Sequence, residues 1–207
     1  MKLADGSHAV QKQFGAWGHI SAKDMADAEE LSYRVADAIG GTNAKAVIRI
    51  KPDTILMDYA VGSEVGHQWL GGRPFRTAEK LYNSPTGYRI GVMDILNSND
   101  DRHGGNWLVA QGLPVPIDNS STFGIGGSGN KGPFRKALER QLPLMGAGGK
   151  VIQGPRGHPF SQAEIDAMNK ALSDPKLVAR FRLAGKTDWY NQMFARWQEL
   201  KVKLEVP

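Results

Sequence analysis

The chain contains no cysteine, so disulfide bonds and thiol chemistry are excluded from any account of its stability or activity. It has no apolar run long enough to cross a membrane as a helix, and no signal peptide is visible at its beginning. Its five histidines, at positions 8, 19, 67, 103 and 158, include no pair with the spacing of metal ligands. No internal repeat is apparent. Its chemistry must therefore rest on oxygen- and nitrogen-bearing side chains.

Length and charge narrow the class of protein further. With 207 residues, the chain is long enough to bury the core of a single domain. Its formal net charge of +5 favours an anionic partner, which suits ATP, an acidic lipid surface or nucleic acid. The basic residues are nevertheless spread out, without a Lys/Arg run or a nucleic-acid-binding motif. Nucleic acid is therefore disfavoured, whereas ATP and peripheral contact with an acidic membrane stay open.

The most informative pattern lies in the polar segment Asn99–Val109 (NDDRHGGNWLV) and the PIDN segment that follows it. It places Asp101, then Asn106 five residues later, then Asp118 twelve residues after that, at the end of an apolar run that predicts a strand over 113–117. Phosphoryl transfer needs a carboxylate that orients and deprotonates the attacking hydroxyl, and oxygen ligands that hold Mg²⁺ on the phosphates. The three side chains suit these roles. The alternative is a polar turn whose Asp and Asn side chains bond their own backbone.

Hydrophobic periodicity and turn signals predict the rest of the secondary structure. Ser21 or Asp24 can cap the first helix, Gly40-Gly41 can end it, and Ser161 with Glu164 forms a capping box before a later one. The predicted strands are 9–14, 46–50, 54–59 and 113–117, and the predicted helices are 21–39, 74–96 with a break at Pro85-Thr86-Gly87, about 161–172, one starting at 174–175, and about 187–204.

Two glycine-rich stretches, 123–132 and 146–159, predict long loops. The first is similar to a P-loop, but Lys131 comes one residue late and Gly132 replaces the Ser/Thr that would bind Mg²⁺. No good helix start follows at once. We therefore expect a flexible loop near the phosphates; contact with them through backbone N–H groups and a plain surface role both stay open.

The segment D-R-H-G-G-N, followed by I-D-N-x-x-x-F ending at Phe123, resembles the catalytic segment of the atypical kinases. The resemblance is to the phosphatidylinositol 3-/4-kinase superfamily, closest to the type II phosphatidylinositol 4-kinases, and to the HipA-type serine kinases. It implies an α+β, two-lobed protein-kinase-like fold, with a minimal small lobe over 1–60 and a mainly helical large lobe over 61–207. It also implies a cytoplasmic kinase that uses ATP and Mg²⁺ to phosphorylate a hydroxyl of a protein or a lipid.

The same resemblance implies a role for each residue of the nucleotide site. Lys12 would contact the ATP phosphates and pair with a glutamate of the next helix. Glu29 is favoured by its spacing from Gly40, and Glu30 would then face solvent. The hinge that reads the adenine would lie at Met57, Asp58 and Tyr59, with Met57 near the gatekeeper position.

For the catalytic loop, the resemblance implies that Asp101 is the base and that Arg102 or His103 supports the loop. Asn106 and Asp118 would hold Mg²⁺. The neighbouring Asp100 is an alternative base, but the D-R-H register favours Asp101.

One departure from the family concerns the start of the sequence. Only eleven residues precede Lys12, whereas kinases have two strands and a Gly-rich loop before the lysine strand. Without a lid over the phosphates, turnover could be slow. A non-catalytic kinase-like module that binds nucleotide or protein is therefore an alternative to the kinase hypothesis. A kinase-fold enzyme that transfers AMP or glutamyl groups is a further alternative.

Overall fold

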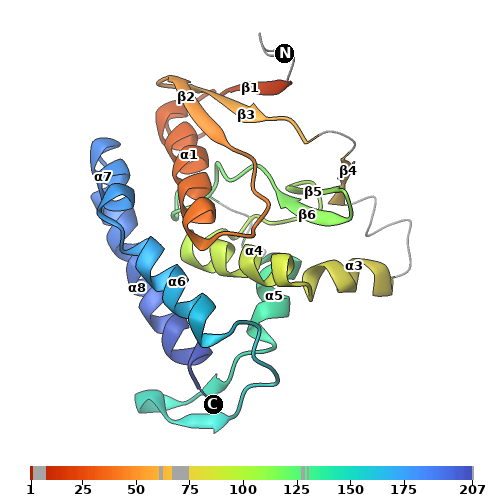
Figure 1. Cartoon of the computed structure of the whole chain (residues 1–207). Helices are drawn as coiled ribbons and strands as arrows, with labels where there is room; N and C mark the ends of the chain where they lie inside the picture. The colour runs from red at the N-terminus through yellow and green to blue at the C-terminus, as the bar shows by residue number, and fades with distance from the viewer. Residues whose placement is uncertain (2–7, 61–62, 67–74, 127–128, 130, 207) are drawn as a thin grey trace.

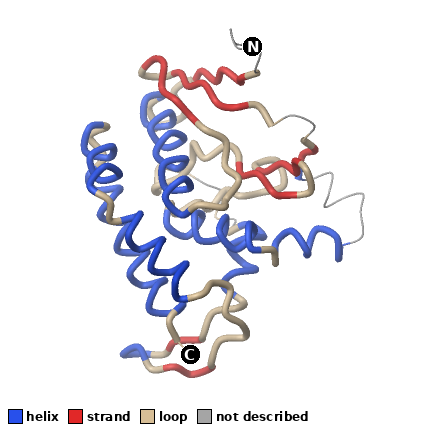
Figure 2. The backbone as a smooth tube through the Cα atoms, in the orientation of Figure 1, coloured by secondary structure: helices blue, strands red, loops and turns tan. Residues whose placement is uncertain are grey.

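The computed structural model describes residues 1, 8–60, 63–66, 75–126, 129 and 131–206, with the side chains of 75–77 left out. Within these residues the chain is a mixed α/β protein with small antiparallel sheets (Figure 1). Figure 2 shows that the strands gather in two groups, with a separate hairpin at the opposite end of the molecule. Three features of the sequence lie outside the described residues: His67; the first residue of the predicted helix 74–96; and part of the first glycine-rich stretch.

The first sheet has the strand order β1-β3-β2 and is antiparallel throughout. It consists of β1 (Ala9–Gln13), β2 (Val47–Lys51) and β3 (Thr54–Asp58), so the predicted strands are confirmed with small shifts at their ends. The tight turn between β2 and β3 confirms the predicted hairpin. Because β3 lies in the middle, the strand that carries Lys12 is directly beside the strand that leads into the predicted hinge.

Helix α1 (Ala22–Ile39) joins the first two strands and lies between the sheet and the C-terminal helices (Figure 1). Of the two predicted caps, Ser21 is the one used, since its side chain accepts a hydrogen bond from the Asp24 backbone N–H at 3.0 Å. Gly40 ends the helix with a φ of 70°, a conformation that favours glycine. One face of the helix is buried against the main core through Ala28, Leu31, Val35, Ala36 and Ile39.

The predicted helix 74–96 is two helices, α3 (Phe75–Tyr82) and α4 (Pro85–Leu96). The predicted break at Pro85-Thr86-Gly87 was misplaced, because Pro85 lies in the first turn of α4. Proline is tolerated there, since the first N–H groups of a helix have no partner within the helix. Ser84 caps this helix by accepting from the Gly87 N–H at 3.0 Å. The chain therefore breaks at residues 83–84.

A second sheet follows, with the order β4-β5-β6. Its strands are β4 (Glu64–Val65), β5 (Trp107–Ala110) and β6 (Leu113–Pro116). Between β5 and β6, Gln111 and Gly112 have φ values of 53° and 76°, as a tight hairpin turn requires. The edge position of β6 accommodates Pro114 and Pro116, which cannot donate to a ladder. This hairpin delivers the chain to Asp118.

Two expectations about the glycine-rich stretches were wrong. Helix α5 (Gly132–Glu139) starts at the end of the first stretch, with Pro133 in its first turn, although no helix start was predicted there. The second stretch contains β8 (Val151–Gln153), which forms a short hairpin with β7 (Leu144–Met145) just before the stretch, through the 3₁₀ turn Ala147–Gly149. Short strands without an alternating apolar pattern leave little trace in a sequence.

The last three helices have the predicted positions. They are α6 (Gln162–Leu172), opened by the predicted capping box; α7 (Pro175–Leu183), capped by Asp174; and α8 (Thr187–Leu204). On α8, Met193 and Trp197 are fully buried, whereas Trp189, Tyr190 and Phe194 are partly buried and pack against the core.

The main hydrophobic core contains residues from both sides of residue 60, the predicted lobe boundary. It combines the inner face of α1 with side chains of α4, α6, α7 and α8. A smaller cluster of Phe14, Ala26, Val47 and Ile55 lies under the first sheet. Helix α1 therefore contributes to both clusters. Among the described residues, no helix is both long and apolar enough to cross a membrane.

Candidate functional site

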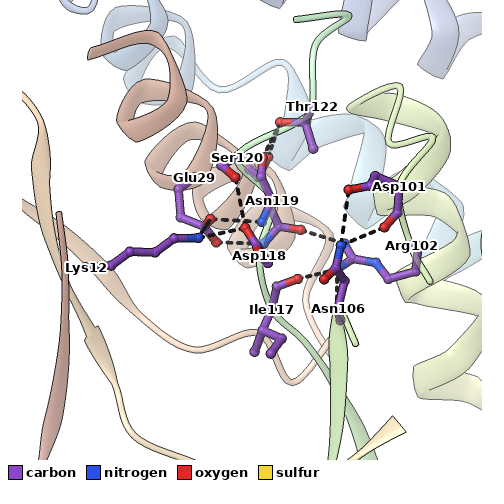
Figure 3. A network of polar contacts seen from close by, with 11 residues as sticks. Lys12, Glu29, Asp101, Arg102, Asn106, Ile117, Asp118, Asn119, Ser120 and Thr122 are labelled. Atoms are coloured by element: carbon purple, nitrogen blue, oxygen red, sulfur yellow. Dashed lines mark hydrogen bonds and ion pairs between the residues drawn. The ribbon is translucent and has the colours of Figure 1, made fainter. Parts of the chain in front are cut away.

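Lys12 lies at the meeting point of three segments that are far apart in the sequence. Its Nζ atom is 2.6 Å from Oδ1 of Asp118, which follows β6, and 3.5 Å from Oε2 of Glu29 on α1 (Figure 3). The lysine side chain projects from β1 and reaches the two carboxylates in front of the helix. The expected pairing of Lys12 with Glu29 is thus present, and Asp118 joins it.

Glu29 is the buried acceptor of this group. Its side chain is only 1% exposed, and it accepts hydrogen bonds from the backbone N–H and the side-chain amide of Asn119, at 2.9 and 3.1 Å. The neighbouring Glu30 faces away and pairs loosely with Arg34 and Arg49 at 3.8 and 3.7 Å. A step of one residue, roughly 100° around the helix, therefore separates the environments of the two glutamates.

Asp118 has an unusual backbone conformation, with a φ of 51°. A left-handed backbone costs most residues about 1–2 kcal/mol, and Asp and Asn tolerate it better because their side chains can bond locally. Ser120 provides such a bond by donating to Oδ1 of Asp118 at 2.8 Å. The Asp118 side chain is 45% exposed. A strained, accessible carboxylate held by its neighbours is typical of a functional position.

The charges in the cluster stabilise one another. Burial alone would raise the pKa of Asp118, but the charge and hydrogen bond of Lys12, together with the Ser120 hydroxyl, outweigh burial and lower it. Burial likewise opposes the charged form of Lys12, yet the charges of Glu29 and Asp118 raise the pKa of this lysine above its ordinary value. Lys12 and Asp118 are therefore both ionised at neutral pH.

Arg102 connects the loop of residues 99–106 to the chain around Asp118. Its side chain is fully buried, and Nη1 donates to the backbone carbonyls of Asn106 and Ile117, both at 2.6 Å. Nη2 donates to Oδ1 of Asn119 at 2.5 Å and to Oδ1 of Asp94 at 2.9 Å. Only arginine offers enough donors in a rigid fork for this set of acceptors. Of the two residues predicted to support the loop, Arg102 is therefore the one whose contacts hold it in place.

His103 is exposed and makes a local contact, accepting from the Gly105 N–H through Nδ1 at 3.0 Å. Inside the loop, Asn106 donates through Nδ2 to the backbone carbonyl of Asp101 at 2.7 Å, with Oδ2 of Asp101 at 3.4 Å. Asn99 fixes the other side by accepting from the Asp101 N–H at 3.0 Å. The loop therefore has the internal bonds of a polar turn, and it is also anchored to a distant segment through Arg102.

The predicted hinge residues lie at the end of β3. Met57 is half-buried, paired in register with Val10 of β1 and Val47 of β2. Asp58 and Tyr59 are exposed, and their backbone N–H groups donate to the carbonyls of Ala46 and His8 at 3.0 and 3.3 Å. These two N–H groups are therefore used within the protein. The adenine-reading role of this segment stays a prediction.

Asp94 and Asn119 belong to the network, although the sequence analysis gave them no role. Asn119 bridges Glu29 and Arg102 with its two side-chain ends, and Asp94 is fully buried against Arg102. The I-D-N motif already contained Asn119. Asp94 had a weaker signal, an acidic residue inside the apolar run of a predicted helix, where burial of a charge demands a partner.

No group of three or more His, Cys, Asp or Glu residues suited to a metal ion occurs within the described part of the chain. The predicted Mg²⁺ ligands are one carboxylate and one amide, which fits a metal that is otherwise held by phosphate oxygens and water. Asp118 uses Oδ1 for Lys12 and Ser120, and Asn106 uses Nδ2 for Asp101, so Oδ2 and the amide oxygen are the candidate ligands. Neither the protein-family models nor the curated proteins contain a match to this chain.

Proposed function

We propose that this protein is a kinase that transfers the γ-phosphoryl group of Mg²⁺-ATP to a hydroxyl of a protein or lipid substrate. The supporting observation is the cluster of Lys12, Glu29 and Asp118, in which β1, α1 and the segment after β6 meet within hydrogen-bonding distance. Kinases require both a lysine–glutamate pair and a metal-binding aspartate in place. A chance ion pair would have no reason to bring together these three residue types from β1, α1 and the segment after β6.

The proposal includes a two-lobed, kinase-like arrangement with the small lobe over residues 1–60 and the large lobe over 61–207. The order β1-β3-β2 supports it, because it sets the lysine strand next to the strand that enters the proposed hinge at Met57, Asp58 and Tyr59. A nucleotide lying along this edge would have its adenine near the end of β3 and its phosphates toward Lys12. Such an enzyme would act in the cytoplasm, where ATP is abundant.

Within this site each residue has a distinct task. Lys12, positioned by Glu29, would bind the phosphates, and Asn106 and Asp118 would hold Mg²⁺, which neutralises charge on the transferred group when bound. Asp101 would accept the proton of the substrate hydroxyl. Arg102 touches no reacting group; it is a positioning residue that fixes the Asp101 loop relative to the Asp118 segment through the backbone carbonyls of both.

Transfer of label from ATP separates this function from its alternatives. The protein is incubated with Mg²⁺ and either γ-labelled or α-labelled ATP, with protein and phosphoinositide acceptors in separate reactions. A kinase transfers label from the γ position only, and Asp101→Asn should remove the transfer. Label from the α position would indicate AMP transfer instead. Saturable Mg²⁺-ATP binding without any transfer would favour a non-catalytic module.

A further inference from the structure

A polar cavity of about 210 Å³ lies between the end of α4, α5 and α8. Ser98, Arg135, Glu139, Arg196, Glu199 and Lys203 form its polar wall. None of these residues belongs to the Lys12 cluster. At roughly 30 Å³ for each water molecule, the space would hold on the order of seven waters or one small polar group.

Arg196, one of the residues that line the cavity, has an unsatisfied donor. Its Nε atom donates to the backbone carbonyl of Leu96, at the C-terminal end of α4, at 2.8 Å. Its Nη2 atom is buried and has no hydrogen-bond acceptor among the described residues. A buried guanidinium nitrogen without an acceptor is unfavourable, because the hydration that it loses is not replaced. Burial, followed by repulsion from Arg135, lowers the pKa of Arg196.

Lys203 adds a second positive charge on the same wall. It lies seven residues after Arg196, two turns along the same face of α8. No ion pair joins Lys203 or Arg196 to a carboxylate in the described part of the chain, whereas the nearby Lys201 pairs with Glu205 at 3.3 Å. Arg135 is already neutralised by Asp100 and Glu139, at 3.0 and 2.9 Å.

Among the residues that line the cavity, three cations, Arg135, Arg196 and Lys203, face two carboxylates, Glu139 and Glu199, so the wall itself has one net positive charge. Asp100, which pairs with Arg135 outside the wall, offsets that charge, so the unsatisfied donor of Arg196 is the stronger argument for a ligand. The unsatisfied group is a donor, and the Ser98 hydroxyl can supply another. Negatively charged acceptors would satisfy these donors. A tetrahedral oxyanion can offer several such acceptors at once, to the guanidinium of Arg196, the ammonium of Lys203 and the hydroxyl of Ser98.

We propose that this cavity is a binding site for a phosphate group, either inorganic phosphate or a phosphomonoester, held by Arg196 and Lys203. The site is separate from the proposed nucleotide site. It borders the Asp101 loop, however, because Arg135 forms one wall and binds Asp100. Phosphate bound here would thus lie next to the segment that we assign to catalysis.

The test is a titration of the whole chain with inorganic phosphate at constant ionic strength, followed by calorimetry and by amide shifts in NMR spectra. Lys203→Gln should weaken phosphate binding about tenfold, the effect of one lost charged hydrogen bond. Arg196→Lys, which keeps the charge and loses the guanidinium fork, should also weaken it. Lys201→Gln on the same helix is the matched control and should have little effect.

Further arms identify the site and the source of the phosphate. Lys12→Ala should leave phosphate affinity unchanged, so a loss in this variant would place the binding at the nucleotide site and overturn the proposal. Absence of saturable binding, or equal losses in Lys201→Gln and Lys203→Gln, would also overturn it. Glycerol phosphate, titrated in parallel, should bind at the same amides; tighter binding than inorganic phosphate would point to a phosphomonoester as the natural ligand.

Discussion

Removal of the Glu29 carboxylate should destabilise the fold far more than removal of its neighbour, Glu30. In Glu29→Ala, Asn119 loses the acceptor of two hydrogen bonds, at 2.9 and 3.1 Å, and Lys12 loses one of its two ionic partners. The backbone N–H of Asn119 is then left buried without its acceptor. Because the deletion removes a charged acceptor from a site that is 1% exposed, water cannot readily replace it.

The magnitude follows from these contacts. A hydrogen bond to a charged group contributes about 1.5–3 kcal/mol, and bonds that share one carboxylate do not add fully. We therefore expect the free energy of unfolding to fall by roughly 2–4 kcal/mol in Glu29→Ala. For a domain of this size that corresponds to a decrease in melting temperature of roughly 5–15 °C. Glu29→Gln, which keeps the shape and one acceptor oxygen, should lose less.

The control is Glu30→Ala, on the same turn of α1. Its contacts with Arg34 and Arg49, at 3.8 and 3.7 Å, are partly exposed and should contribute about 0–1 kcal/mol. Urea unfolding followed by circular dichroism measures all three variants under the same conditions. If Glu30→Ala were as destabilising as Glu29→Ala, or if Glu29→Ala were neutral, the assignment of Glu29 as the buried acceptor would be wrong.

Four further predictions address the site and its surroundings. Asp118→Asn, which tolerates the left-handed backbone, should abolish Mg²⁺-dependent ATP binding in calorimetry while the variant stays folded; unaltered affinity would remove Asp118 as a metal ligand. Asp101→Asn should lower phosphoryl-transfer turnover by about 10²–10⁴-fold with nucleotide affinity intact, and Asp100→Asn far less; parental turnover in Asp101→Asn would show that this is not the catalytic loop. In urea titrations the parent should have a larger free energy of unfolding than Asp118→Asn at neutral pH, because the pKa of Asp118 is lowered in the folded protein. This difference should disappear as the pH falls through the lowered pKa of Asp118, and it should also disappear at alkaline pH, where Lys12, with its raised pKa, loses its proton. Burial raises the pKa of Tyr82 to about 12, and its buried hydroxyl has no partner among the described residues, so Tyr82→Phe should increase the free energy of unfolding by roughly 1 kcal/mol; a clear loss of stability would mean that the hydroxyl is hydrogen-bonded.

Local chemistry in the sequence was sufficient to locate most helices and strands. Ser21, Ser161 and Asp174 each cap the helix that they were expected to open, because a cap depends on the side chain at one position and backbone N–H groups two or three residues away. The same short range explains the hairpin of β2 and β3. Where the local signal was weak, prediction failed, as it did for α5 and for the hairpin of β7 and β8.

The site residues also fall into two groups: those that the sequence identified and those whose role only the tertiary structure decided. Asp118 could be named from its motif, and Lys12 and Glu29 from the resemblance to a kinase family, but their meeting within one cluster depends on how β1, α1 and the segment after β6 pack. The role of Arg102 was decided by tertiary structure alone, since its acceptors are spread from Asp94 to Asn119 and only the folded chain brings them around one guanidinium. The sequence by itself determined which residues are candidates for phosphoryl-transfer chemistry and where most of the helices and strands lie. Burial and long-range contact, which no local pattern encodes, decided that Glu29 and Asn119 complete the cluster while Glu30 and His103 remain at its edge.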